Sequence, residues 1–193
     1  MRMFVALVPS AEAVEHLDAF LEPRRQQADL RWVDPEHVHL TLAFLADVEE
    51  RRLDDLVERL GRAARRRTTF TARIAGGGAF PNVARARVVW AGLAVEEPGE
   101  VELPRLATGV RAAAARAGIA VDGQRFKPHV TLGRRRVPGE VSHWVRLLDG
   151  YAGPTWTADR VALVQSHLGE GPRGRPRYVV VDEFALGGTT PRI

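Results

Sequence analysis

The feature that most constrains this chain is a tetrapeptide, His-x-Thr-Leu, that occurs in the two segments HVHLTLAFL and FKPHVTLGR. Both segments read as short apolar strands. Residues two apart in a strand share a face, so His39 and Thr41 point one way, and so do His129 and Thr131. Each strand therefore offers one imidazole and one hydroxyl on a rigid base. The repetition, 90 residues apart, suggests two related lobes that face each other.

The rest of the chain alternates between strand and helix patterns. Ser10 is suited to begin a helix and Gly118 to follow the end of one. The connections resemble hairpins, which favours an α+β fold with mostly antiparallel sheet. We expect strands over 2–8, 30–33, 37–45, 70–75, 86–93, 129–133, 159–168 and 177–186, and helices over 10–21, 49–66, 101–117 and 141–148.

Composition limits the class of protein. The 193 residues are 45% hydrophobic and 27% charged, as in an ordinary globular chain, and no Gly/Ser-rich linker divides them. We therefore expect one bilobal domain over 1–193. The absence of cysteine excludes disulfides and thiolate metal sites. No apolar run approaches the roughly 20 residues that span a bilayer, and MRMFVALVPS reads as a first strand rather than a signal peptide, so a cytoplasmic protein is expected.

The charge permits a phosphate-bearing partner without requiring one. The net charge is +4, and every basic residue except Lys127 is an arginine. Arginine suits phosphate because its planar fork donates two parallel hydrogen bonds, although a GC-rich genome gives the same bias. The run Arg65–Arg67 closes a predicted helix, where cations suit the dipole, and we interpret it as structural. Gly76–Gly78 lacks the residues of a phosphate loop and is interpreted as a turn or bulge.

The paired motifs point to acid–base chemistry on a phosphodiester. A single histidine in a half-buried strand is often a hydrogen-bonded core residue, but two in the same tetrapeptide favour a site. A neutral imidazole can accept a proton while an imidazolium donates one. Threonine hydroxyls between them can stabilise the charge that grows on phosphate oxygens. This chemistry needs no metal.

The chain resembles the two-histidine phosphoesterase superfamily, in its RNA 2′,3′-cyclic phosphodiesterase branch, called LigT-like or 2′-5′ RNA ligase. The resemblance rests on the two motifs and on MRMFVALVPS, LRWVDPEHVHLTLAFLADV, GGGAFPNVARARVVWAGL, RFKPHVTLGR and RVALVQSHL…PRYVVVDEFAL. It implies two α+β lobes with a central cleft. It also implies opening of a 2′,3′-cyclic phosphate at an RNA 3′ end to a 2′-phosphate. No cofactor, no metal and a monomer are expected.

The resemblance also implies roles for individual residues. His39 would donate a proton to the departing 3′ oxygen, and His129 would accept one from water. Thr41 and Thr131 would hold the phosphate, and Arg134 would contact it.

Three neighbours of the motifs are candidate contacts to a base or to the rim of the cleft. Phe126 could stack on a base, whereas core packing is at least as reasonable for Phe44 and Phe80. Trp32 could border the cleft or pack in the core. His37 shares the face of His39 if the strand already runs there, and the two could chelate a metal, but no third ligand is evident in the sequence.

Two other functions remain open. The same fold could act on small cyclic phosphates, on 2′-5′ oligonucleotides or as a 2′-5′ RNA ligase. A protein that binds RNA ends without turnover is the alternative from a different class. A panel of these substrates and a product analysis would separate the three.

Overall fold

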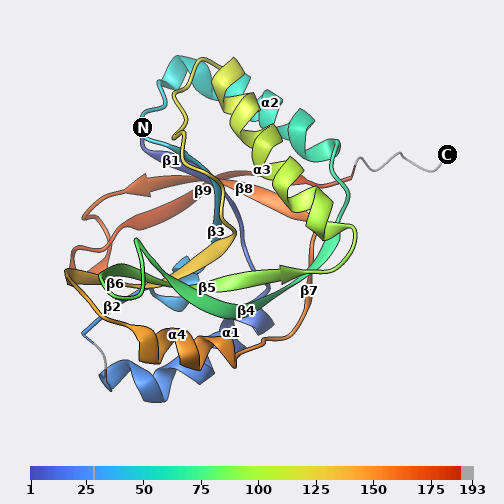
Figure 1. The fold of residues 1–193 in the computed structure, drawn as a ribbon. Helices are drawn as coiled ribbons and strands as arrows, with labels where there is room; N and C mark the ends of the chain where they lie inside the picture. Colours follow the sequence, from blue (N-terminus) through green and yellow to red (C-terminus); the bar gives the residue numbers. More distant parts are fainter. Residues whose placement is uncertain (28, 188–193) are drawn as a thin grey trace.

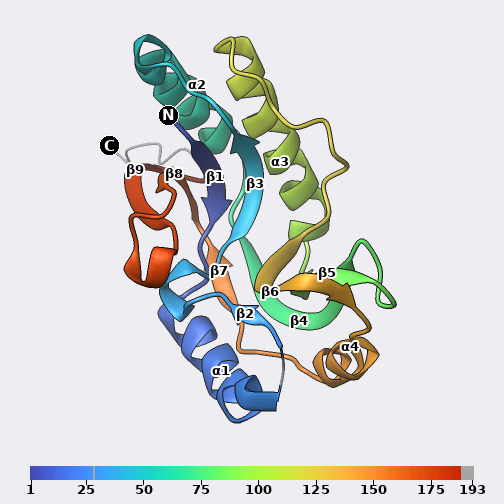
Figure 2. The same cartoon turned by 90° about the vertical axis from the view of Figure 1, so that its left-hand side faces the viewer.

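The computed structural model describes residues 1–27 and 29–187, and an antiparallel sheet forms its centre (Figures 1 and 2). The strand order is β7-β4-β5-β6-β3-β1-β8-β9, and β2 adds to β6. The strands in this part of the chain are β1 (Met3–Leu7), β2 (Arg31–Trp32), β3 (Leu40–Leu45), β4 (Phe70–Phe80), β5 (Ala86–Val95), β6 (His129–Gly139), β7 (Trp156–Ala158), β8 (Arg160–His167) and β9 (Arg177–Ala185).

The sheet consists of two lobes that meet between β3 and β6. One lobe holds β1, β3, β8 and β9, and the other holds β2, β4, β5, β6 and β7. The only register pair between β3 and β6 in the described residues is Leu40 with Val130, so the strands touch briefly and then diverge. The predicted α+β fold with two lobes is confirmed. The boundaries of a single domain over 1–193 stay a prediction, because residues 28 and 188–193 lie outside the described part.

The helices lie at two opposite ends of the molecule in both views (Figures 1 and 2). α2 and α3 pack together at one end, on β9 and β3, and α1 and α4 lie at the other, on β4. No helix in residues 1–27 and 29–187 is long and apolar enough to cross a membrane. The bounds are α1 (Ala11–Leu21), α2 (Leu53–Arg65), α3 (Gly99–Arg116) and α4 (Ser142–Asp149), with short 3₁₀ turns η1 (Glu22–Gln27), η2 (Pro35–His37), η3 (Glu50–Arg52) and η4 (Pro172–Gly174).

Local sequence explains the helix positions. The Oγ of Ser10 accepts a hydrogen bond from the Ala13 N–H at 3.2 Å, which caps α1 as predicted. In α2, the apolar residues recur every three or four positions, so Leu56, Leu60 and Ala64 are buried while the arginines between them face outward.

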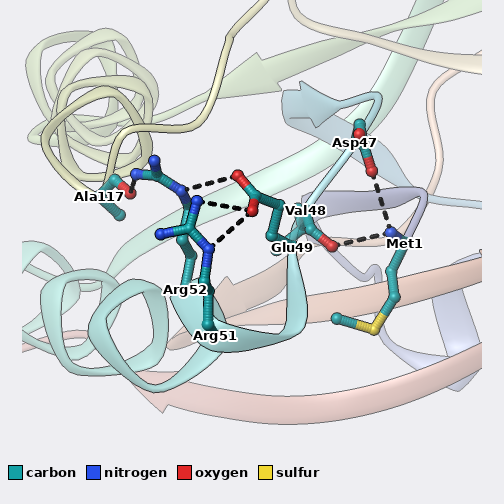
Figure 3. A network of polar contacts seen from close by, with 7 residues as sticks. All are labelled: Met1, Asp47, Val48, Glu49, Arg51, Arg52 and Ala117. Carbon is teal, nitrogen blue, oxygen red and sulfur yellow. Dashed lines mark hydrogen bonds and ion pairs between the residues drawn. The ribbon is translucent and has the colours of Figure 1, made fainter.

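A polar network ties the start of α2 to the end of α3 (Figure 3). The Arg52 guanidinium donates to the carbonyl of Ala117 at 2.8 Å and to the carboxylate of Glu49 at 3.2 Å. The chain's amino group donates to the carbonyl of Val48 at 2.8 Å, which anchors β1 to the same segment. The network fixes one end of the helix pair relative to the sheet.

Several strand predictions differ from the structure. β6, expected to end at Gly133, continues to Gly139. The strand expected from His37 begins at Leu40, because Pro35 starts a 3₁₀ turn in which the His37 N–H donates to the carbonyl of Asp34 at 2.8 Å. The short strand β7 was missed: it has three residues, too few for a periodic signal.

The glycine-rich stretch lies inside a strand rather than in a loop. β4, expected to end at Ala75, continues to Phe80. Its register with β5 shifts between Ile74 and Gly77, so the bulge part of the prediction is correct, and Gly76 has a φ of +70°. A Cβ on Gly78 would lie only 2.2 Å from the ring of Trp90, so glycine is needed where this ring covers the strand.

We expect Gly78→Ala to destabilise the fold by about 1–3 kcal/mol, because the added methyl group must displace the Trp90 ring. Thermal unfolding followed by tryptophan fluorescence measures the effect. Gly123→Ala is the matched control, because no described atom lies within 4 Å of the place its added Cβ would take and its φ is not positive. Its effect should stay within about 0.5 kcal/mol. Equal unfolding temperatures for the two variants would contradict the role of Gly78.

Candidate active site

The contact between the lobes brings the two motifs together. In an antiparallel pair, the neighbours of one residue face the neighbours of its partner in reverse order. The Leu40–Val130 pair therefore sets His39 beside Thr131 and Thr41 beside His129. Leu40 and Val130 themselves are buried in the core. The four polar side chains accordingly share the opposite face of the two strands.

A bulge lies at the last residue of each motif and changes which later residues face the cleft. The register of β6 with β5 skips Leu132, and the register of β3 with β1 skips Leu42. One extra residue reverses the alternation of a strand. Arg134 therefore shares a face with Thr131, three residues earlier, and Phe44 stands in the equivalent place on β3. Simple alternation would have put both on the far side.

A pocket of about 200 Å³ contains most of the predicted site. His39, Thr41, Thr131 and Arg134 line it together, so the structure brings these four residues to one place. The sequence prediction missed several of its other lining residues. Those are Arg2, Phe4, Val33, Phe44, Ser166 and Tyr178.

Each motif histidine is held by the backbone carbonyl two residues before it. The Nδ1 atom of His39 lies 2.7 Å from the oxygen of His37, and the Nδ1 atom of His129 lies 2.7 Å from the oxygen of Lys127. A carbonyl can only accept, so Nδ1–H is the donor in both rings. The proton on Nδ1 leaves Nε2 as the atom that can accept or donate a proton in the cleft.

Aromatic rings fix the orientation of both imidazoles. Phe4 stacks on His39, with 4.5 Å between ring centroids and 19° between planes. Phe80 meets His129 edge-on at 4.9 Å, and Tyr178 lies with its edge toward His39 at 5.8 Å. Rings held by both a hydrogen bond and packing lose little entropy on binding, which suits precise proton transfer.

The electrostatics of the site favour neutral imidazoles. Burial, followed by the positive charges of His37, His129 and Arg134, lowers the pKa of His39 to about 4, although the hydrogen bond to the His37 carbonyl opposes the shift. Burial also lowers the pKa of His129, with smaller contributions from Arg134 and Lys127. Both rings are therefore bases at neutral pH when the cleft holds no anion.

A second cavity, of about 860 Å³, opens beside His129. Phe80, Pro81, Phe126 and Pro128 give it apolar walls, and Arg125 is among the cations around it. Phe126 thus lies where a base contact is feasible, and its role stays a prediction.

The remaining two candidates lie in different places. His37 lines the smaller pocket from the 3₁₀ turn, 4.5 Å from the Tyr178 ring. Trp32 lines neither pocket. Its indole packs on Trp144 at 5.1 Å and donates to the Arg25 carbonyl at 3.3 Å, so the structure does not bring it to the motifs.

Comparison with known proteins assigns the family. The family model described as LigT like Phosphoesterase matches residues 5–90 and 93–173. The chain belongs to this family. One motif histidine falls in each matched stretch, His39 in the first and His129 in the second.

Two relatives of this LigT-like phosphoesterase are similar to it over nearly their whole length. The RNA 2′,3′-cyclic phosphodiesterase of Aquifex aeolicus is 30% identical over 97% of this chain and 98% of its own. The RNA 2′,3′-cyclic phosphodiesterase of Thermus thermophilus is 34% identical over 97% of this chain and 91% of its own. The crystal structure of Escherichia coli LigT complexed with 3′-AMP superposes with a TM-score of 0.76 at 27% identity, covering 97% of this chain and 98% of LigT.

Metal ligands do not gather in the described part of this LigT-like chain. No group of three or more His, Asp or Glu residues in 1–27 and 29–187 could hold a metal ion. The Nδ1 atom of His39 is engaged by the backbone, and the carboxylate beside His37 is that of Glu36, at 3.7 Å. Metal independence of the reaction is left to the experiment below.

Proposed function

We propose that this LigT-like phosphoesterase opens the 2′,3′-cyclic phosphate at the 3′ end of RNA and leaves a 2′-phosphate. The observation that carries the proposal is the pair of motif histidines, each with its Nδ1–H on a backbone carbonyl. The strand register sets Thr131 beside His39 and Thr41 beside His129, and Arg134 lines the same pocket as His39. The names of the Aquifex and Thermus relatives support the substrate class.

In the proposed reaction, water attacks phosphorus and the bond from phosphorus to the 3′ oxygen breaks. His129 accepts the proton that water loses, and His39 donates a proton to the 3′ oxygen as it leaves. The hydroxyls of Thr41 and Thr131 and the guanidinium of Arg134 donate to the non-bridging oxygens, whose charge grows in the transition state. Proton exchange with solvent then restores both histidines.

The donor must be protonated before it can act. Because burial lowers the pKa of His39 and keeps the ring neutral in the unliganded site, the phosphate must supply the negative charge that favours its imidazolium. Protonation of the acid would thus depend on substrate binding. Without substrate, the His39 ring would stay neutral.

Product analysis tests the proposal. An RNA ending in a 2′,3′-cyclic phosphate should yield a 2′-phosphomonoester, and EDTA should leave the rate unchanged because His39 and His129 supply the proton transfers. Phosphorus NMR distinguishes the 2′ and 3′ products. A 3′-phosphate would contradict the leaving-group assignment, and a rate abolished by EDTA would contradict metal-free catalysis.

The same assay separates the alternatives. Small cyclic phosphates and 2′-5′ oligonucleotides, offered at equal concentration, should turn over with a lower kcat/KM than the RNA terminus. Binding of RNA ends without any product would instead identify an RNA-end-binding protein.

A further inference from the structure

The outer face of the helix pair α2–α3 carries a groove that the proposed chemistry does not use. It has a volume of about 530 Å³ and is lined by six arginines with small residues between them. The arginines are Arg59, Arg62, Arg66, Arg67, Arg105 and Arg116. Arg66 and Arg67 belong to the run that the sequence pattern places at a helix end.

The groove lies away from the histidine cleft. α3 packs on β3, and Leu40 and Leu42 of that strand are buried in the core that includes Leu106 and Val110 of α3. Thr41 points to the opposite face of the strand. A ligand in the groove therefore contacts the molecule at a place separate from the catalytic residues.

Positive charge is concentrated on these helices. Residues 53–67 hold five arginines and three carboxylates, and residues 99–116 hold three arginines and two carboxylates. Their net excess is three positive charges, against +4 for the whole chain. Among the described residues, no carboxylate lines the groove.

Half of the groove's arginines have no partner of their own in the described part of the chain. Arg59 pairs with Asp55, Arg62 with Glu58 and Arg67 with Glu102. Within residues 1–27 and 29–187, the side chains of Arg66, Arg105 and Arg116 make no ion pair or hydrogen bond, and all three are exposed. Free guanidinium groups lining one groove are suited to bind phosphate oxygens in pairs.

The walls of the groove are held at both ends. Arg52 joins α2 to the carbonyl of Ala117 at one end. At the other, the carboxylate of Glu102 accepts from the Thr68 N–H at 2.9 Å and lies 3.8 Å from the Arg67 guanidinium. A groove of fixed width needs little reorganisation to bind a ligand.

We infer that this groove binds the phosphate backbone of the RNA substrate at a distance from its 3′ end. No aromatic side chain of residues 1–27 and 29–187 lines the groove, so a nucleobase has nothing to stack on, which favours a sugar–phosphate backbone over a free nucleotide. Arg105 and Arg116 are about 16 Å apart along α3, a distance that spans several phosphates of one strand. The inference rests on RNA being the substrate, as proposed above.

The test compares two substrates and two variants. Arg105→Gln/Arg116→Gln removes two free groove charges. Arg85→Gln/Arg146→Gln is the matched control, because it removes two exposed charges, one just before β5 and one on α4, whose side chains make no ion pair or hydrogen bond in the described residues. The probes are an RNA hairpin of about 30 nucleotides with a single-stranded 3′ tail, and a dinucleotide, both ending in the cyclic phosphate. Binding is measured by fluorescence anisotropy at several salt concentrations, and turnover is measured for both probes.

We expect the groove variant to bind the hairpin about tenfold more weakly. The slope of log affinity against log salt concentration should become shallower by about one for each arginine lost. Its kcat/KM for the dinucleotide should match that of the wild type and of the control. Hairpin affinity equal to that of the control would overturn the inference, and so would an equal loss with the dinucleotide. Failure of the proposed function has a different signature, because the wild-type protein would then release no product from either probe.

Discussion

His39→Ala and His129→Ala are each expected to lower kcat for RNA 2′,3′-cyclic phosphate by about 10²–10⁴-fold, the usual contribution of a general acid or base. In both rings Nδ1 is engaged by a carbonyl, which leaves Nε2 as the atom that exchanges a proton, and alanine removes that atom. Single-turnover kinetics with saturating enzyme measures the effect. The double variant should lose little more than either single one, because the two groups act in one step.

His143→Ala is the matched control for these variants. This exposed histidine lies on α4, lines neither pocket and meets the Trp144 ring only at 6.4 Å, so its replacement should leave kcat unchanged. Full activity in either motif variant would end the two-histidine mechanism.

A second measurement distinguishes the acid from the base. A phosphodiester that releases p-nitrophenolate needs no protonation of its leaving group. It should therefore restore much of the rate to His39→Ala and little to His129→Ala. The reverse pattern would exchange the two roles while keeping the mechanism.

The side chains that share a face at the centre of this candidate site could be predicted because the motif is local. Two residues in one strand share a face whatever the rest of the chain does, and the recurrence of His-x-Thr-Leu identified both strands. The amphipathic pattern of α2 and the Ser10 cap were equally local signals. The confirmed α+β fold follows from such patterns and from hairpin-like spacing.

The periphery of the site depends on tertiary structure, which the pattern does not contain. Arg134 faces the cleft because Leu132 is an extra residue in the pairing with β5, and a bulge leaves no periodic signal. Phe4 reads as one more apolar residue of a first strand, yet it stacks on His39. Trp32 is of a residue type that suits the rim of a cleft, but it packs against the core.

The groove between α2 and α3 shows the same limit. Its arginines come from the α2 and α3 regions, which β4 and β5 separate along the chain. The sequence of neither helix alone therefore predicts a shared surface. Only the packing of the pair brings Arg66 and Arg105 to one groove. The run Arg65–Arg67, interpreted as structural because it ends a helix, can therefore still contribute to a binding surface.

Lowering the pH from 6.5 to 4 is expected to destabilise the unliganded protein by about 2–3 kcal/mol through His39 alone. Its pKa is about 4 in the folded protein and about 6.5 in an unfolded chain. Between these values the unfolded state binds the extra proton, so the free energy of unfolding falls as pH falls and is unaffected above this window. Denaturant titrations of wild type and His39→Gln at several pH values measure the free energy of unfolding. The substitution should remove the part of its pH dependence that His39 causes. Identical pH profiles would contradict the lowered pKa.

Inorganic phosphate should then raise the pKa of His39 back towards its ordinary range, because a bound anion next to Thr41 and Thr131 favours the imidazolium. The shift of the His39 ring signals with pH, followed by NMR with and without phosphate, tests this directly. His16 is an internal reference, since its Nδ1 bonds to the Tyr151 hydroxyl at 2.9 Å outside both pockets. A pKa that stays near 4 with phosphate bound would contradict the coupling of His39 protonation to substrate binding.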